Sequence, residues 1–532
     1  MDFKTLDWII LSVYFTGLFS IGLYFSRKGK NTSQYFLADR KSRWYQIGLS
    51  IFAANISSEH LIGLAGSGAA VGLAVGAYEW VAAFCLFTLA WIFVPHYLRS
   101  KVFTMPEFLE KRFNSSCRWY LSSISIIAYI FTKISVSLFA GGIVLHALVG
   151  WDFLTSALIL LAITGLYTIL GGLSAVIFAD VIQSLILIVG SAIIVLIGLD
   201  KVGGFEGLRN TLPADFFSMI RPASHAVYPW TGTTLGIFIL GIWYWSTDQF
   251  IVQKALSARN LNHAQSGINF TALLKILPVF LFVLPGLIAR SLWPDELVAS
   301  PDNAFPLIVS RLMPGGLTGI MIAALLAALV SSLSSVFNAS STLITMDIYK
   351  KIRPESTEKQ LVFAGRFFTL VIVIIGILWI PMIRYLSNQI YQYLQNVQAY
   401  ISPPIAVVFI MGIAWRKATP RAAIYTLISG GILGALRFIL DILYRTGEFR
   451  LEILNDIAGI AFLNFCIILF AVCMLIMVVI SLAFRTRPDS GHESLMLRLS
   501  SGGQKNGLWK TVNILVSVMI GLTIITLWAH FS

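Results

Sequence analysis

The residues best suited to binding chemistry lie in the segment ANISSEH, residues 54–60, inside an apolar stretch long enough to cross a membrane. This segment places amide, hydroxyl, carboxylate and imidazole groups where lipid satisfies none of them. Serine and asparagine often bond neighbouring helices in membrane bundles, which is the simplest interpretation of the segment. Glu59 and His60 favour a binding site instead, because ionisable groups inside a span are costly and commonly mark a substrate or ion pathway.

A second polar cluster, AALVSSLSSVFNAS, covers residues 327–340. Ala328, Ser331, Ser332 and Ser335 follow i, i+3, i+4, i+7 spacing and therefore share one face of a helix. Hydroxyl and carbonyl oxygens on such a stripe suit a hard cation such as sodium. The same stripe also fits small-residue helix packing, with each hydroxyl bonded to the preceding turn.

Asp180 lies in the apolar run GGLSAVIFADVIQ, with no basic residue within reach along its own helix. An acid in that position needs either a partner on another helix or a bound cation to stabilise its charge. Asp180 therefore strengthens the cation interpretation of the serine stripe without excluding an ion pair.

Three further polar residues, Glu79, Lys275 and Gln395, interrupt apolar runs. Lys275 lies near the edge of its span, so its ammonium group can either stay buried or extend to the membrane interface. Aromatic residues such as Tyr78 and Trp245 accompany these groups; they fit either an interfacial aromatic belt or a site that stacks a ring on a sugar.

The composition indicates the elements that position these residues. The 532-residue chain is 57% hydrophobic and only 12% charged, with a mean hydropathy of +0.81, which indicates an all-α polytopic membrane protein. Apolar runs of membrane-spanning length recur along nearly the whole chain. They predict about 14 transmembrane helices, near residues 7–26, 45–70, 75–98, 119–148, 153–170, 174–199, 232–253, 270–291, 315–346, 361–384, 389–414, 421–442, 457–484 and 509–530.

The distribution of charge predicts the topology. The net charge is +13, and most of the 38 Lys and Arg residues fall in alternate loops. By the positive-inside rule these loops face the cytoplasm and both termini face outward. We therefore expect a multi-pass protein of the plasma membrane, or of the inner membrane in a bacterium. The basic surplus marks orientation in the bilayer, so a nucleic-acid partner is not expected.

The predicted spans form two sets of five. Residues 45–199 and 232–414 each hold five helices, and an odd number of crossings gives two such units opposite orientations. Each unit opens with an interrupted helix, at ANISSEH and at GIWYWSTDQ, and such breaks free carbonyl oxygens to coordinate a cation or a polar solute. Residues 1–30 and 421–532 would then be peripheral helices around a single transporter domain.

Several ordered motifs resemble the sodium/solute symporter family, and within it the sodium/glucose and sodium/galactose cotransporter branch. The resemblance covers nearly the full chain, and TMPEFLEKRF and the GGLSA run are especially specific. It implies the 5+5 inverted repeat of the leucine-transporter fold. The motifs that carry it are YFLADR, AANISSEHLIGLAGSGAA, YEW, TMPEFLEKRF, LGGLSAVIFADVIQ, WYWSTDQFIVQKALSA, ALVSSLSSVFNASSTLITMDIY and ISPPIAVVFIMGIAWRK.

The resemblance also assigns residues by position. The family's common sodium site would use the carbonyls of Ala53, Ile56 and Ala328 with the hydroxyls of Ser331 and Ser332. A second sodium site, which only part of the family has, would use Asp180, Ser334 and Ser335. The sugar site would comprise Asn55, His60, Glu79, Trp245, Lys275 and Gln395, with Tyr244 as inner gate and Leu64, Tyr78 and Tyr391 as outer gate.

The function implied is sodium-coupled import of a neutral sugar, a glucose- or galactose-type hexose, by alternating access. His60 resembles the glucose transporters, whereas Gly241 and Ala82 replace an amide and a hydroxyl found in a bacterial galactose member. A sodium symporter for another solute, such as myo-inositol, another polyol or a carboxylate, stays open, as does a transporter-like sensor. An enzyme is not expected, because the seven histidines form no ligand spacing such as HExxH. A single chain is the expected functional unit.

Overall fold

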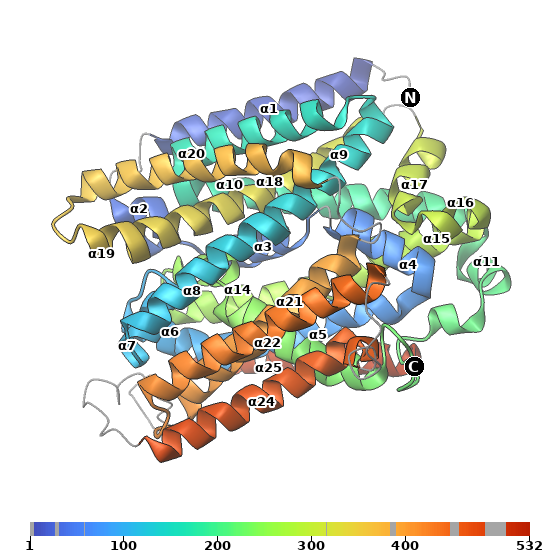
Figure 1. Ribbon diagram of the computed structural model, residues 1–532. Coiled ribbons are helices and arrows are strands. Elements are labelled where there is room, and N and C mark those ends of the chain that lie inside the picture. Colours follow the sequence, from blue (N-terminus) through green and yellow to red (C-terminus); the bar gives the residue numbers. More distant parts are fainter. Residues whose placement is uncertain are drawn as a thin grey trace.

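The computed structural model describes residues 5–26, 31–57, 59–314, 317–383, 390–446, 457–484 and 507–532. Within these ranges every regular element is a helix, which confirms the predicted all-α class, and the long helices run side by side as a bundle (Figure 1). The principal helices are α1 (Thr5–Ser26), α3 (Trp44–Asn55), α5 (Ala77–Thr88), α8 (Ser115–Ala128), α9 (Ser135–Val149), α10 (Phe153–Val202), α14 (Leu261–Leu274), α15 (Leu284–Leu292), α18 (Thr318–Thr342), α20 (Glu358–Ile383), α21 (Ile390–Ala414), α22 (Pro420–Thr446), α24 (Phe462–Ala483) and α25 (Leu508–His530).

The number of membrane spans differs between sequence and structure. Among the described residues, 11 helices are long and apolar enough to cross a bilayer, or 12 if one bent pair is counted as a span. The sequence divides residues 153–199 into two runs, and α10, which counts once among these helices with its 50 residues, contains a non-helical residue, Gly172, between those runs. At 1.5 Å per residue the parts before and after that break, residues 153–171 and 173–202, are about 28 and 45 Å long, so each is about long enough to cross a hydrocarbon core of about 30 Å. The count of 14 stays a prediction.

Helix α18 lies at the centre of the bundle. Almost every side chain between Thr318 and Thr342 is buried, and α18 packs against α1, α3, α10 and α20. A helix that is apolar all round and carries serines inside is enclosed by protein rather than lipid. The serine stripe therefore faces other helices.

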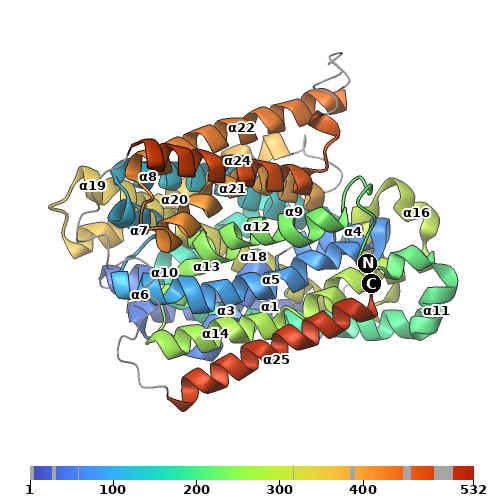
Figure 2. The same cartoon turned by 90° about the horizontal axis from the view of Figure 1, so that it is seen from below.

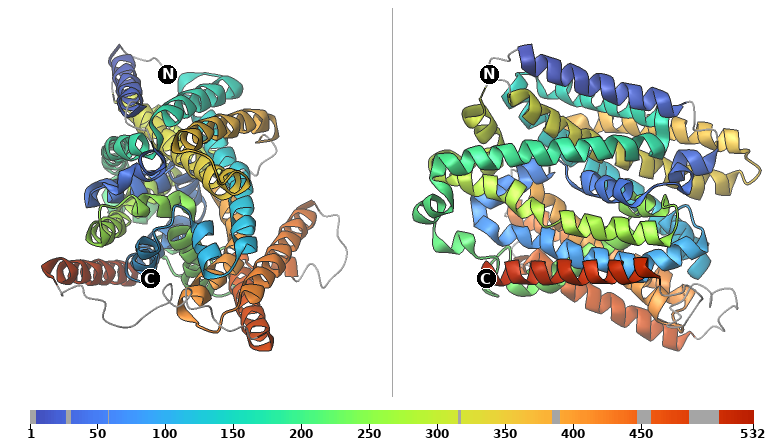
Figure 3. Two further views of the ribbon diagram at one scale, coloured as in Figure 1. Left: turned by 90° about the vertical axis from the view of Figure 1, so that its left-hand side faces the viewer. Right: turned by 180° about the vertical axis from the view of Figure 1, so that it is seen from behind.

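The outermost helices expose apolar side chains. The view from below places α24 and α25 on the outside of the bundle (Figure 2), and Leu475 and Leu508 are largely exposed there. Such a surface fits contact with lipid tails. Helix α1 begins and α25 ends at the same end of the molecule (Figure 3).

The helix at ANISSEH is interrupted, as the sequence predicts. Helix α3 stops at Asn55, and the chain resumes in a π-helical turn, η2 (Glu59–Leu64), that leads into α4 (Ala65–Val71). The last regular bond of α3 runs from the Ile56 N–H to the Phe52 carbonyl, 2.9 Å. The carbonyls that follow lie beyond the end of the helical hydrogen-bond pattern.

The helix at GIWYWSTDQ is also interrupted. Helix α12 (Ile237–Gly241) passes into a π-helical turn, η8 (Ile242–Thr247), and α13 (Gln249–Leu256) continues after a 47° bend. Asp248 is extended at the break and accepts a hydrogen bond from the Phe250 N–H, 3.2 Å. Single π turns inside helices frequently mark functional sites.

A third break divides α10 at Gly172, which has φ +57° and ψ −157°. This conformation is essentially restricted to glycine. The backbone also approaches closely, since a Cβ at Gly172 would lie 2.6 Å from the carbonyl oxygen of Tyr35 on α2 (Thr32–Leu37). The break lets α2 pack against α10 where the sequence predicts a loop between spans.

We expect Gly172→Ala to lower the free energy of unfolding by about 1–3 kcal/mol, because alanine is strained in this backbone conformation and meets Tyr35. Thermal unfolding of the purified protein in detergent measures the change. Gly17→Ala in α1 is the control, because a Cβ there meets nothing within 4 Å. Equal melting temperatures for the two variants would contradict the assignment of strain to Gly172.

Candidate functional site

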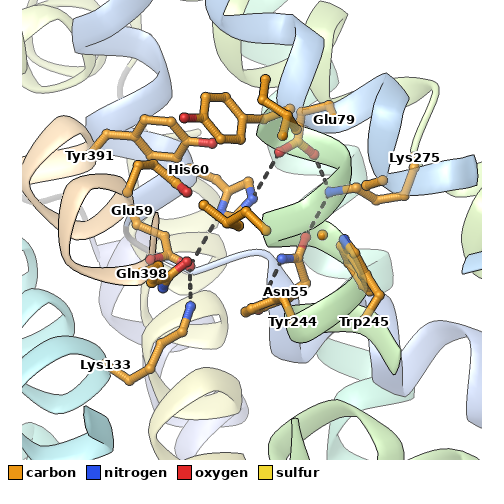
Figure 4. Close-up of a pocket in the computed structure, with 16 residues that line it drawn as sticks. Asn55, Glu59, His60, Glu79, Lys133, Tyr244, Trp245, Lys275, Tyr391 and Gln398 are labelled. Atoms are coloured by element: carbon orange, nitrogen blue, oxygen red, sulfur yellow. Dashed lines mark hydrogen bonds and ion pairs between the residues drawn. The ribbon is translucent and has the colours of Figure 1, made fainter. Parts of the chain in front are cut away.

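A polar cavity lies between the two broken helices (Figure 4). Its volume is about 40 Å³, enough for a few water molecules at ~10–15 Å³ each. Side chains from α5, α21 and the π-helical turn η5 (Tyr129–Ile134), with Lys275 just past the end of α14, complete its wall. The lining residues are Asn55, Glu59, His60, Tyr78, Glu79, Ala82, Lys133, Ile237, Leu240, Gly241, Tyr244, Trp245, Lys275, Tyr391, Gln395 and Gln398.

The structure brings together all six residues assigned to the sugar site. Asn55, His60, Glu79, Trp245, Lys275 and Gln395 line the cavity, as do three of the four gate residues, Tyr78, Tyr244 and Tyr391. Leu64, the fourth gate residue, is buried at the end of η2 and is not part of the lining.

One ion pair of the cavity joins Glu79 to Lys275. The Lys275 ammonium group also donates to the Asn55 side-chain oxygen at 2.7 Å, and the Asn55 amide donates to the Tyr244 hydroxyl at 3.1 Å. Lys275 is 1% exposed, so the alternative in which it extends to the interface is wrong. Glu79 holds it inside because a lone ammonium group there is costly.

A second ion pair joins Glu59 to Lys133, 2.8 Å between Oε1 and Nζ. Lys133 also lies 4.8 Å from the centroid of the Tyr244 ring. The sequence singled out Glu59 as favouring a binding site, but the assigned sugar site included neither Glu59 nor Lys133. The available signal was a lysine in the apolar run YIFTKI, since such a lysine needs a partner.

His60 connects the two ion pairs. Its Nε2 lies 3.3 Å from the Glu79 carboxylate, and its Nδ1 lies 3.9 Å from Glu59 (Figure 4). The wall thus carries two carboxylates and two ammonium groups, which cancel when the imidazole is neutral. This arrangement suits an uncharged solute that both donates and accepts hydrogen bonds.

Two buried polar atoms of the wall have no hydrogen-bond partner among the described residues: the Tyr78 hydroxyl and the Gln395 side-chain oxygen. Buried polar groups are normally satisfied, so unpaired ones in a cavity indicate groups that a ligand or water bonds. The Trp245 ring, 5.2 Å from the Lys275 ammonium, offers an aromatic face beside them.

The assigned cation ligands belong to two helices that pack against each other, α3 and α18. Ala53 and Ile56 belong to the end of α3, and α3 packs against α18, which carries Ala328, Ser331 and Ser332. The Ser332 hydroxyl is buried without a hydrogen-bond partner among the described residues. That oxygen is free to coordinate a cation. The alternative of a hydroxyl bonded to the preceding turn therefore does not apply to Ser332.

Asp180 has a partner on another helix. Its Oδ2 lies 2.5 Å from the Lys254 ammonium group of α13 and accepts a hydrogen bond from Ser50 at 2.5 Å. Its Oδ1 accepts a hydrogen bond from Ser331, also at 2.5 Å. The predicted span 232–253 ended one residue before Lys254, and sequence spacing within one helix cannot reveal a pair between two helices.

Of the other residues assigned to the second sodium site, Ser334 donates a hydrogen bond to the Ser331 carbonyl at 3.0 Å.

Two broken helices that meet at a buried polar cavity define a membrane transporter. The sodium:solute symporter family model matches residues 35–430. The chain belongs to this family.

The chain is also similar to individual proteins that are named for the solute they transport. The chain is 42% identical to sodium/glucose cotransporter 4 of Danio rerio over 91% of its own length and 79% of that protein. It is 39% identical to sodium/myo-inositol cotransporter 2 of Oryctolagus cuniculus, over 91% and 77% of the two chains. A solved structure of a Na⁺-coupled sialic acid symporter has the same fold, with a TM-score of 0.77 at 22% identity over 91% of this chain and 99% of that one.

We expect Lys275→Met to lower the free energy of unfolding by about 3–5 kcal/mol without any solute, because it leaves the Glu79 carboxylate buried and unpaired. Glu79→Gln combined with Lys275→Met should cost less than Lys275→Met alone, since no lone charge remains. Chemical unfolding in mixed micelles measures the double-mutant cycle.

Arg311→Met, which breaks the half-exposed pair with Glu296, is the control and should cost less than ~1 kcal/mol. Additive effects of the two cavity substitutions would show that Glu79 and Lys275 do not form a coupled pair.

Proposed function

We propose that the protein couples sodium influx to the import of a neutral hexose, glucose or galactose, by alternating access. The observation that carries the proposal is the charge-balanced wall of the cavity. Its carboxylates, ammonium groups, amides and imidazole offer both donors and acceptors to a ring of hydroxyl groups, and Trp245 offers an aromatic face. The likeness to sodium/glucose cotransporters supports the same solute.

A carboxylate solute is less compatible with this wall. Lys133 and Lys275 are both already neutralised by Glu59 and Glu79, so a negatively charged solute would add a charge to a balanced, buried site. Myo-inositol is the second candidate, because it is a neutral ring of hydroxyl groups and a similar protein bears its name.

Alternating access follows from the size of the cavity. A volume of about 40 Å³ is far below the ~300–1,000 Å³ of ordinary ligand pockets, so a sugar enters only when part of the wall moves. Tyr78 and Tyr391 contact each other with ring centroids 5.5 Å apart, consistent with an outer gate. Tyr244 borders the other side of the cavity and bonds Asn55, consistent with an inner gate.

Sodium would bind where α3 ends. The ligands would be the carbonyls of Ala53, Ile56 and Ala328 with the hydroxyls of Ser331 and Ser332. A cation there joins the broken helix to α18 and so stabilises Asn55 and His60, a few residues further along, in the cavity wall. Each solute then raises the affinity for the other by the same factor.

The proposed architecture has 14 crossings arranged as two inverted repeats, 45–199 and 232–414, with peripheral helices at 1–30 and 421–532. Two features support it: α10 is long enough to cross twice, and its break lies at Gly172, between two predicted spans. The start of α1 and the end of α25 lie at one end of the molecule, which agrees with an even number of crossings (Figure 3). We place the monomer in the plasma membrane with both termini outside.

Purified protein in proteoliposomes should take up labelled glucose or galactose only with an inward sodium gradient. Potassium in place of sodium should abolish uptake, and unlabelled sugar should compete. Parallel assays with myo-inositol and with a monocarboxylate test the alternative solutes. Uptake of neither hexose would overturn the sugar assignment, and uptake without sodium would overturn the coupling.

Ser332→Ala should lower sodium affinity at least tenfold while leaving the amount of folded protein unchanged, because a buried ligand oxygen is removed. Binding of ²²Na⁺ without sugar measures this directly. Ser340→Ala is the matched control: Ser340 is also buried in α18 without a hydrogen-bond partner among the described residues, but it lies eight positions further along the helix. Equal losses in both variants would place the sodium ion elsewhere.

A further inference from the structure

A loop beside the gate tyrosines has no part in the mechanism described so far. This outer loop, residues 218–231, joins η6 (Ala214–Phe217) to η7 (Gly232–Gly236). It lies next to the end of α25, because the Met219 N–H donates a hydrogen bond to the Phe531 carbonyl at 2.7 Å. The proposed topology places that end of the molecule outside the cell.

The outer loop brings a third tyrosine to the gate. Tyr228 is 2% exposed, and its ring contacts the Tyr78 ring edge to face, with centroids 6.3 Å apart. Tyr78 makes the same kind of contact with Tyr391. Tyr78 and Tyr391 line the cavity, whereas Tyr228 is not part of the lining. Tyr228 therefore supports the gate from behind, without contact with the solute.

Hydrogen bonds within the outer loop fix the position of Tyr228. The His225 Nδ1 accepts hydrogen bonds from the Val227 N–H at 3.3 Å and from the Tyr228 N–H at 3.0 Å. The loop is closed at its base by the Trp230 N–H, which donates to the Arg221 carbonyl at 3.1 Å. A loop closed by its own bonds is a compact unit, so the position of Tyr228 depends on the loop as a whole.

Arg221 connects the outer loop to the first broken helix. Its buried guanidinium group donates to the Val71 carbonyl at 2.7 Å and pairs with Asp215 at 2.7 Å. Val71 is the last residue of α4, the helix that continues from η2 and its cavity residue His60. The loop is therefore joined to the same chain segment that forms part of the cavity wall.

We infer that Tyr228 is a further gating residue and that the outer loop is a lid on the outer gate. A sugar enters the cavity of about 40 Å³ only when Tyr78 and Tyr391 separate. A movement of Tyr78 away from Tyr391 also changes its contact with Tyr228, so the loop stabilises the closed gate. Tyr228 acts through Tyr78 as a positioning residue. The inference rests on the proposed function, because it concerns the outer gate of that transport cycle.

The test is access to the cavity from outside, in intact cells without sodium or sugar. Ala82→Cys places a thiol in the cavity wall, and the four native cysteines are buried. A membrane-impermeant thiol reagent then labels the new cysteine at a rate that reports opening of the outer gate. Adding Tyr228→Ala should raise this rate about fivefold, because an aromatic contact that favours the closed gate is lost.

Two further variants separate gating from general loss of structure. Tyr228→Phe keeps the ring and should be labelled as slowly as the parent. Trp230→Ala is the matched control, because it removes an aromatic side chain of the same loop that is 49% exposed, and it should leave the rate unchanged. Tyr228→Ala without Ala82→Cys should stay unlabelled, since labelling of the native cysteines would indicate unfolding.

An unchanged rate in Tyr228→Ala, an equal rise in Trp230→Ala or Tyr228→Phe, or labelling of the native cysteines would overturn the inference. If Tyr228→Ala does not reach the cell surface, Arg221→Met decides. It removes the bond to Val71 and should also raise the rate, and no rise would overturn the inference. The expected labelling without hexose uptake by the same cells would overturn only the sugar assignment.

Discussion

The cost of placing charge in a dry interior governs the arrangement of this protein. Each buried carboxylate of the cavity, and Asp180 next to α18, lies beside an ammonium group from a different helix, because neither charge is tolerable alone. The pairs Glu79–Lys275, Glu59–Lys133 and Asp180–Lys254 therefore act as fixed connections between helices. These ion pairs keep the polar groups of neighbouring helices aligned. Apolar side chains alone would hold the helices together weakly, because lipid tails are as apolar as those side chains.

The two broken helices supply the polar groups that these pairs surround. At the end of α3 the regular hydrogen-bond pattern stops and the chain resumes in the π-helical turn η2, and at Asp248 the π-helical turn η8 ends before α13 begins. Breaks of this kind are tolerated at membrane depth only where protein or water satisfies the freed backbone groups. The cavity lies between the breaks. Each break therefore exposes polar groups that can bind a solute, and those same groups must be enclosed by protein rather than lipid.

The sequence predicts features that depend on residue type along one segment. The interruptions at ANISSEH and GIWYWSTDQ and the shared face of Ser331 and Ser332 follow from composition and helical spacing, and the structure contains them. Features that depend on a second helix could not be derived this way. The partners of Lys133 and Lys254 lie far away in sequence. The division at Gly172 falls between two spans that the sequence predicts, 153–170 and 174–199, whereas the contact of that break with α2 involves a second helix and could not be predicted.

The balanced charges of the cavity have an electrical consequence for the sugar-free carrier. The charges of Glu59, Glu79, Lys133 and Lys275 cancel, so the wall is neutral when the His60 imidazole is uncharged. An empty cavity that reorients from one side of the membrane to the other then carries no net charge through the field. A membrane potential contributes about 2.3 kcal/mol per elementary charge per 100 mV. Voltage would therefore leave the return step of the cycle unaffected and act on the sodium ion alone.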